Sequence, residues 1–223
     1  MCGRFIRKSV LEELARYFGV SIEDAPFFAP SYNVAPQSFQ PVVRLRQGAG
    51  AREIALMRWG LVPFWAKDLK IGYSTINARS EEVAGKPAFR EALKRRRCLV
   101  PADGFYEWQR IDEKTKQPFA IALKSGEPCA FAGLWERWEA GEGPTLESFT
   151  ILTTGPNELM QPIHNRMPVI LEPGDYGRWL EAADTAELLK PYPAEKMRAW
   201  PVGSRVGNVR NNDAGLMEGD TGD

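Results

Sequence analysis

The chain has 223 residues, of which 43% are hydrophobic, and it carries 29 basic and 29 acidic residues. A chain of this length and composition can bury the core of one large domain or two small ones. The even balance excludes a globally basic nucleic-acid-binding protein, so any surface that binds nucleic acid must be local. Residues 211–223 hold four acidic and no basic side chains, which leaves 29 basic against 25 acidic residues in the rest of the chain.

Cysteine and histidine are too few and too scattered to indicate a metal site. They are Cys2, Cys98, Cys129 and His164, and no CxxC or HxxxH spacing occurs. Only a metal site assembled from distant residues stays open. The odd number of cysteines and the lack of a signal peptide predict a protein of the reducing cytoplasm. No apolar run is long enough to cross a membrane.

Hydrophobic periodicity and turn residues predict a chain rich in strands. The expected strands are residues 2–7, 41–46, 53–59, 98–109 (broken by a turn), 118–123, 129–138, 147–154 and 198–203. The expected helices are residues 10–18, 87–96 and one or two within 174–190, with a short helix or turn at 156–161. Because strands outnumber helices and often follow one another, we expect one α+β domain over residues 1–212, an antiparallel, barrel-like β core flanked by helices. Residues 213–223 are expected to form an acidic, disordered tail.

Local signals set several boundaries. Ser9 and Glu12 have the spacing of a capping box at the start of the first helix, and Gly19 should end that helix. Residues 20–40 are proline-rich and are expected to form a long loop, either a surface connection or a functional segment. Turns are expected at residues 47–50 and 141–144.

The start of the chain holds a candidate reagent. Removal of Met1 would give Cys2 a free α-amine beside its own thiol. The two groups have ordinary pKa values of about 8 and 8.5, so modest tuning makes both nucleophilic. Such an aminothiol condenses with an aldehyde to a Schiff base and then closes to a thiazolidine. Taken alone, Cys2 is as readily a small buried core residue.

Two further residues are candidates for proton transfer. Glu107 lies between Tyr106 and Trp108 in an expected strand, where burial among aromatic rings would suit a general acid or base. A salt-bridged strand glutamate is the alternative. His164 stands between a proline turn and an apolar strand, in the polar sequence His-Asn-Arg. A single histidine is usually structural, but a strand-end residue can also point into a cleft.

Aromatic and basic segments could serve nucleic acid. Residues 59–68 hold two tryptophans and a phenylalanine among glycine and proline, which favours core packing or an exposed ring that stacks on a base. Residues 94–97 (KRRR) end an expected helix. Their charge complements the helix dipole and could also extend a phosphate-binding surface.

Taken together, short blocks along the chain resemble the SRAP (SOS response-associated peptidase) family. They are residues 2–5 (CGRF), 32–36 (YNVAP), 59–63 (WGLVP), 65–67 (WAK), 77–81 (NARSE), 104–108 (GFYEW) and 164–168 (HNRMP). The resemblance runs from residue 2 to about residue 210. It implies a β-rich core with peripheral helices and a positively charged groove.

The same resemblance implies a sensor of abasic sites in single-stranded DNA. In this family the mature N-terminal cysteine forms a thiazolidine with the ring-opened sugar aldehyde, giving a DNA–protein crosslink that shields the lesion. The family's catalytic residues fall on Cys2, Asn77, Glu107 and His164, and its DNA contacts on Arg4, Asn33, Pro36, Trp65, Arg79 and Arg166. It implies an enzyme with Schiff-base, lyase-type chemistry and a possible thiol autopeptidase activity that removes Met1. The implied reaction needs no metal or organic cofactor, and the resemblance implies a monomer.

The chemistry of the residues suggests a role for each group. His164 would protonate the ring oxygen as the sugar opens, and Glu107 would move protons as the amine adds and water leaves. Asn77 cannot titrate, so it would orient Cys2 or the sugar. The arginines would bind phosphates, and Trp65 and the Pro36 loop would contact the bases beside the lesion.

Three other functions remain open at this stage. An N-terminal-cysteine amidohydrolase also begins Met-Cys-Gly, although nothing downstream resembles its glutamine-binding motifs. A thiol protease or autopeptidase could combine Cys2 and His164 with Asn77 or Asn165. A non-covalent single-strand binder would leave Cys2 incidental and would bind reversibly with salt.

Overall fold

The computed structural model describes residues 2–23, 25–46, 48, 50–139 and 143–219. The strands are β1 (Phe5–Arg7), β2 (Ser31–Val34), β3 (Phe39–Leu45), β4 (Arg52–Trp59), β5 (Asn77–Arg79), β6 (Arg97–Ala102), β7 (Gly104–Arg110), β8 (Lys116–Leu123), β9 (Cys129–Glu139), β10 (Thr145–Thr154), β11 (Met167–Pro168), β12 (Ile170–Leu171) and β13 (Met197–Pro201). The α-helices are α1 (Leu11–Phe18), α2 (Arg90–Arg95) and α3 (Tyr176–Glu181), joined by short 3₁₀ turns.

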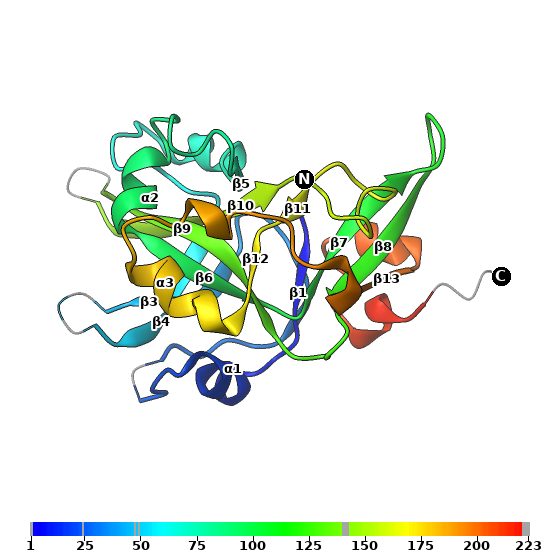
Figure 1. The fold of residues 1–223 in the computed structure, drawn as a ribbon, viewed down its shortest axis with the longest axis horizontal. Helices are drawn as coiled ribbons and strands as arrows, with labels where there is room; N and C mark the ends of the chain where they lie inside the picture. Colours follow the sequence, from blue (N-terminus) through cyan, green and yellow to red (C-terminus); the bar gives the residue numbers. More distant parts are fainter. Residues whose placement is uncertain (1, 24, 47, 49, 140–142, 220–223) are drawn as a thin grey trace.

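Five strands close into a barrel. β10 pairs with β4 on one side and with β9 on the other, so the ring β10–β4–β3–β6–β9 returns to its first strand (Figure 1). The pairs β3–β4, β3–β6, β6–β9 and β9–β10 are antiparallel. The expected α+β fold with a barrel-like core is confirmed, but the strand pair that closes the barrel, β10–β4, is parallel.

A second sheet lies beside the barrel. Its order is β13–β8–β7–β1–β2, and every pairing in it is antiparallel. β1 follows directly on Cys2 and pairs with β7, the strand that carries Glu107. β5, which begins with Asn77, and β11, which follows His164, pair with β10 of the barrel. The two sheets therefore bring three distant segments toward the start of the chain (Figure 1).

The interior is filled by aromatic side chains. Phe5 lies 5.2 Å from Trp59 and 6.0 Å from Phe131 between ring centroids, and Trp59 stacks on Phe149 at 6.4 Å. Cys2 belongs to this same buried cluster. The outer side of the barrel is covered by the helices α1 and α3, whose buried residues pack in a second cluster. Because β1 begins in this densely packed core, the residues just before it, including Cys2, are held in place.

The start of the first helix differs from the expectation. Val10, not Ser9, is the N-cap residue, and the helix begins at Leu11. Ser9 instead donates its hydroxyl to Asp103 Oδ1 at 2.6 Å, and its backbone N–H donates to Oδ2 at 2.9 Å. The predicted capping box at Ser9 is therefore wrong, because Ser9 donates its hydrogen bonds to the buried Asp103 carboxylate and does not cap the start of the helix. Gly19 ends the helix with a φ of 64°, as expected.

The proline-rich segment and the turns are partly resolved into structure. Residues 20–40 are not one loop, since β2 and the first residues of β3 lie within them. The expected hairpin is confirmed as β3 and β4. Its turn contains residues 47 and 49, and the turn at 141–144 contains residues 141 and 142, all of which lie outside the described residues.

The tail is ordered as far as it is described. Ala214–Met217 form a 3₁₀ turn, and the Leu216 side chain is buried. Trp200 Nε1 donates to the carbonyl of Met217 at 2.8 Å. The expected disorder is therefore wrong for residues 213–219, because an apolar side chain docks them, while residues 220–223 lie outside the described part. No helix in the described residues is long and apolar enough to cross a membrane.

Candidate functional site

Cys2 is fully buried and held through its backbone. The side-chain amide of Asn77 donates from Nδ2 to the carbonyl oxygen of Cys2 at 2.7 Å. The Cys2 Sγ lies 3.9 Å from the carbonyl oxygen of Arg4. Burial raises the pKa of the Cys2 thiol well above its usual range, and the negative charge of Glu107 raises it further. The thiol is therefore protonated near neutral pH.

Asn77 owes its position to a parallel pair of strands. It begins β5 and lies opposite Ile151 of β10, so its side chain is delivered from the barrel to the start of the chain. The Oδ1 atom of Asn77 is buried and accepts no hydrogen bond from the described residues. The Asn77 Oδ1 atom is therefore an unused hydrogen-bond acceptor near the Cys2 backbone.

Glu107 and His164 form an acid–base pair. The Glu107 side chain is buried, and its Oε1 lies 3.9 Å from Nδ1 of His164. The Arg166 backbone N–H lies 3.0 Å from His164 Nδ1 and the Arg166 carbonyl oxygen lies 3.3 Å from the same nitrogen, so the backbone of Arg166 holds the imidazole in place. Gln109 Nε2 donates to the Pro162 carbonyl at 2.9 Å and ties β7 to the His164 loop.

The four expected catalytic residues therefore meet. The amide of Asn77 contacts Cys2, the charge of Glu107 acts on the Cys2 thiol, and His164 lies beside Glu107. They come from the start of the chain, β5, β7 and the loop before β11. A thiol, an amide, a carboxylate and an imidazole in one place can carry out nucleophilic addition with proton transfer.

Arg4 and Asn33 are engaged within the protein. Arg4 Nη1 donates to Asn33 Oδ1 at 2.8 Å and to the Val206 carbonyl at 2.9 Å, and its guanidinium lies 5.9 Å from the Trp108 ring centroid. The buried Asn33 amide donates to the carbonyls of Val206, Asn208 and Asn211. Both residues thus fasten the segment after β13 next to the start of the chain.

The other expected DNA contacts lie nearer the surface. Trp65 is 48% exposed, Pro36 is half-buried, and the exposed Arg79 side chain reaches Glu82 at 3.4 Å. Arg166 is different, because its side chain is only 14% exposed and is bound by Glu81. Sequence reasoning placed Arg166 on phosphates and gave no role to Glu81.

The Pro36 loop touches a turn that carries an exposed aromatic ring. Gln37 Nε2 donates to the Gly72 carbonyl at 3.1 Å, which joins the Pro36 loop to the turn that ends in Tyr73. Gly60 lies against the same carbonyl with a φ of 124°, and a side chain there would collide with it. Tyr73 is 67% exposed, yet the sequence did not mark it, since one tyrosine in a polar segment carries no periodic signal.

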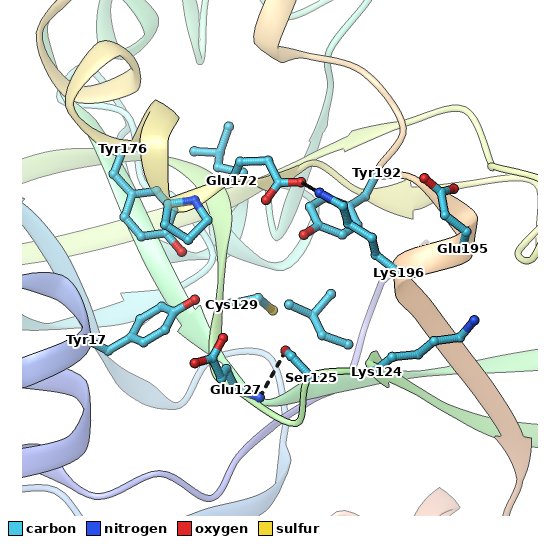
Figure 2. A pocket seen from close by; sticks show the side chains of 13 residues that line it. Tyr17, Lys124, Ser125, Glu127, Cys129, Glu172, Tyr176, Tyr192, Glu195 and Lys196 are labelled. Carbon is cyan, nitrogen blue, oxygen red and sulfur yellow. Dashed lines mark hydrogen bonds and ion pairs between the residues drawn. The ribbon is translucent and has the colours of Figure 1, made fainter.

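A separate cavity lies apart from the four catalytic candidates. Its volume is about 410 Å³, and Tyr17, Tyr176 and Tyr192 turn toward Cys129 within it (Figure 2). Lys196 and Glu172 form an ion pair of 2.6 Å at its edge. None of the four catalytic candidates lines it, and burial raises the pKa of the Cys129 thiol above its usual range.

The described residues hold no group of three or more histidine, cysteine or carboxylate side chains that could bind a metal ion.

A β-barrel and a second sheet here bring together a buried cysteine next to the start of the chain, an asparagine, a glutamate and a histidine, and this arrangement characterises one class of protein. The chain belongs to the SOS response associated peptidase (SRAP) family, whose model matches residues 1–209. The match covers both sheets and all ten expected site residues.

Named relatives and solved structures are similar to this chain over most of its length. The chain is 45% identical over 225 residues to the abasic site processing protein YoqW of Bacillus subtilis strain 168, covering 98% of this chain and 99% of YoqW. It is 37% identical to the abasic site processing protein HMCES of Xenopus tropicalis, over 87% of this chain and 67% of that protein. A crystal structure from Bacteroides thetaiotaomicron matches with a TM-score of 0.88 and 28% identity, over 98% of this chain and all of that chain. One from Bordetella bronchiseptica matches with a TM-score of 0.77 and 30% identity, over 91% and 100%.

Proposed function

We propose that this protein processes abasic sites in single-stranded DNA and captures them as a covalent thiazolidine at Cys2. The observation that carries the proposal is the contact of Asn77 with the Cys2 backbone, with the Glu107–His164 pair beside the same thiol. The relatives named abasic site processing proteins supply the substrate class.

The reaction begins at the amine. Removal of Met1 frees the α-amine of Cys2, and Asn77 keeps the Cys2 carbonyl fixed during the reaction. The closed sugar opens to an aldehyde as His164 donates a proton toward the ring oxygen. The amine adds to the aldehyde carbon, and loss of one water leaves a C=N bond.

The thiol then closes the ring. Its proton leaves the sulfur, the sulfur bonds to the former aldehyde carbon, and the nitrogen takes up a proton. No electron is transferred to another reagent, so the product equals protein plus DNA less one water. Because burial keeps the Cys2 thiol protonated, this step needs a base, and Glu107 is the carboxylate whose charge acts on that sulfur.

The DNA strand is bound by surrounding groups. Arg79 and Arg166 contact phosphates, Arg4 and Asn33 support the start of the chain, and Trp65 with the Pro36 loop contacts bases that flank the lesion. The protein acts as a monomer on single strands, in the cytoplasm and on the nucleoid. It uses lyase-type Schiff-base chemistry, and a thiol autopeptidase step can supply the mature cysteine.

Intact mass spectrometry tests the proposal. Purified protein is measured before and after incubation with a single-stranded oligonucleotide that carries one abasic site. We expect loss of Met1 and an adduct of protein plus DNA less one water that survives heat and detergent. A trimmed protein without an adduct favours amidohydrolase or protease chemistry, and retained Met1 removes the aminothiol on which the proposal depends.

A further inference from the structure

The guanidinium of Arg166 is already bound to a carboxylate. Its Nη1 lies 2.7 Å from Glu81 Oε1, and its Nη2 lies 2.9 Å from Glu81 Oε2. This is the paired geometry in which arginine also binds the two free oxygens of a phosphodiester. The Glu81 carboxylate therefore occupies the place that a DNA phosphate would take on Arg166.

Few donors of Arg166 remain for a phosphate. Nη2 donates to the Thr153 carbonyl at 2.6 Å as well as to Glu81. Nε is buried and makes no hydrogen bond to the described residues. A guanidinium has five N–H groups, so only the second N–H of Nη1 faces outward while Glu81 stays in place. A phosphate cannot bind this arginine at two points unless Glu81 leaves.

The two partners differ in how firmly they are held. Arg166 is anchored by Thr153 on β10, and its side chain is 14% exposed. The Glu81 side chain is 54% exposed and extends from the turn after β5. Arg166 holds the pKa of Glu81 below its usual range, so this carboxylate is charged at neutral pH. Glu81 can thus swing away into water while Arg166 keeps its position.

We propose that Glu81 is a specificity-determining residue that competes with DNA phosphate for Arg166. The inference rests on the proposed function, in that the competing ligand is a single DNA strand. Each strand that binds must displace the carboxylate, which lowers the affinity for intact DNA. Retention then depends on covalent capture of an aldehyde, which intact DNA lacks, and Glu81 thereby increases discrimination in favour of abasic DNA.

The test compares Glu81→Gln with Glu172→Gln. Both variants remove one negative charge, but the Glu172 carboxylate pairs with Lys196 at 2.6 Å at the edge of the separate cavity and with none of the arginines proposed to bind phosphate. Affinity for an intact, fluorescently labelled oligonucleotide is measured by anisotropy over a series of salt concentrations. We expect Glu81→Gln to bind about three- to tenfold more tightly than Glu172→Gln.

The salt series adds a second readout. One additional phosphate contact makes the slope of log K against log salt more negative by about 0.7 on a single strand. Glu81→Gln should show this change relative to Glu172→Gln, and the double variant Glu81→Gln, Arg166→Gln should lose it. If Glu81→Gln binds no more tightly than Glu172→Gln, Glu81 merely holds Arg166 in place and the inference is wrong.

Folding and the proposed function are separated by two further measurements. Glu81→Asp keeps the charge but shortens the side chain, so we expect an affinity between those of the wild type and Glu81→Gln. An affinity equal to that of Glu81→Gln would show that any change in the turn has this effect, which contradicts the inference. Crosslinking of the wild type to abasic DNA decides the proposed function by itself, since the intact oligonucleotide has no aldehyde.

Discussion

The amide of Asn77 donates to the backbone carbonyl of Cys2 at 2.7 Å, although the two residues belong to different sheets. Asn77 starts β5, which pairs with the barrel strand β10, whereas Cys2 leads into β1 of the second sheet. One hydrogen bond therefore fixes the start of the chain relative to the barrel. The nucleophile is positioned through its backbone, which leaves the thiol and the amine available for reaction.

Replacing Asn77 by alanine should uncouple the nucleophile from the barrel. Loss of a buried hydrogen bond is expected to lower the free energy of unfolding by about 1–2 kcal/mol. We expect the rate of crosslinking to an abasic oligonucleotide to fall by about tenfold or more, as misplacement of a reacting group does, while affinity for an intact strand changes little. Asn77→Asp is the matched variant, because it keeps the size and loses the N–H donor. Wild-type crosslinking by Asn77→Asp would show that the bond is unimportant.

Cys2→Ala should turn the crosslinking protein into a weak strand-nicking lyase. The variant keeps the α-amine and forms the Schiff base, but no sulfur closes the ring, so a neighbouring base can promote β-elimination. The readouts are strand scission on a denaturing gel and trapping of the protein on DNA by borohydride. Cys98→Ala, which removes a buried thiol elsewhere in the core, should crosslink as the wild type does. An amine-first mechanism requires at least one of these products from Cys2→Ala.

Glu107→Gln should separate the acidity of the thiol from the rate of capture. Removing the carboxylate charge lowers the pKa of the Cys2 thiol, because that charge is the second cause, after burial, of its raised pKa. The pH at which a small alkylating reagent modifies Cys2 should therefore shift downward. Crosslinking should nevertheless become slower, since the base that takes the thiol proton is gone. Faster crosslinking would mean that thiol acidity alone limits the reaction.

Stability should decline at alkaline pH because all three cysteines are buried. Burial raises the pKa of Cys2, Cys98 and Cys129 far above the value of about 8.5 expected in the unfolded chain. Their contribution is complete below pH 8.5, and it is lost as the pH rises and the unfolded chain releases thiol protons. The slope should approach about 1.4 kcal/mol per pH unit for each thiol. Urea unfolding between pH 7 and 10 measures it, and Cys98→Ala should reduce the slope by about one third.

The longer strands were predictable because their signal is local, whereas the short strands β2 and β5 were not expected. β3 and β4 alternate or run apolar between turn residues, and the helix α1 ends at Gly19 where the sequence predicts it. The parallel pair β4–β10 was not predictable, since Arg58 and Ser148 come together from distant parts of the chain. Likewise, no local rule predicts that Ser9 hydrogen-bonds to Asp103 and not to the start of the helix. Long-range competition of this kind lies outside sequence periodicity.

The site shows the same division. The chemistry of Cys2, Glu107 and His164 could be inferred from residue type and neighbours, and the resemblance to a family supplied Asn77. The partners of the arginines could not be inferred, because the sequence does not show that Arg4 contacts Asn33 or that Arg166 contacts Glu81. An arginine in a motif predicts a positive charge, whereas its availability depends on which acceptor folds against it.

The burial of Cys2 has a consequence for the order of events during synthesis. Its surroundings include Asn77, Glu107 and the Ile163 region, so the wall around it is incomplete until more than 160 residues have left the ribosome. The N-terminal part of a chain emerges first, and until then the first residues stay open to an aminopeptidase. We therefore expect an aminopeptidase to remove Met1 from the nascent chain. A chain that folds with Met1 still attached would depend on the proposed autopeptidase step to gain its mature cysteine.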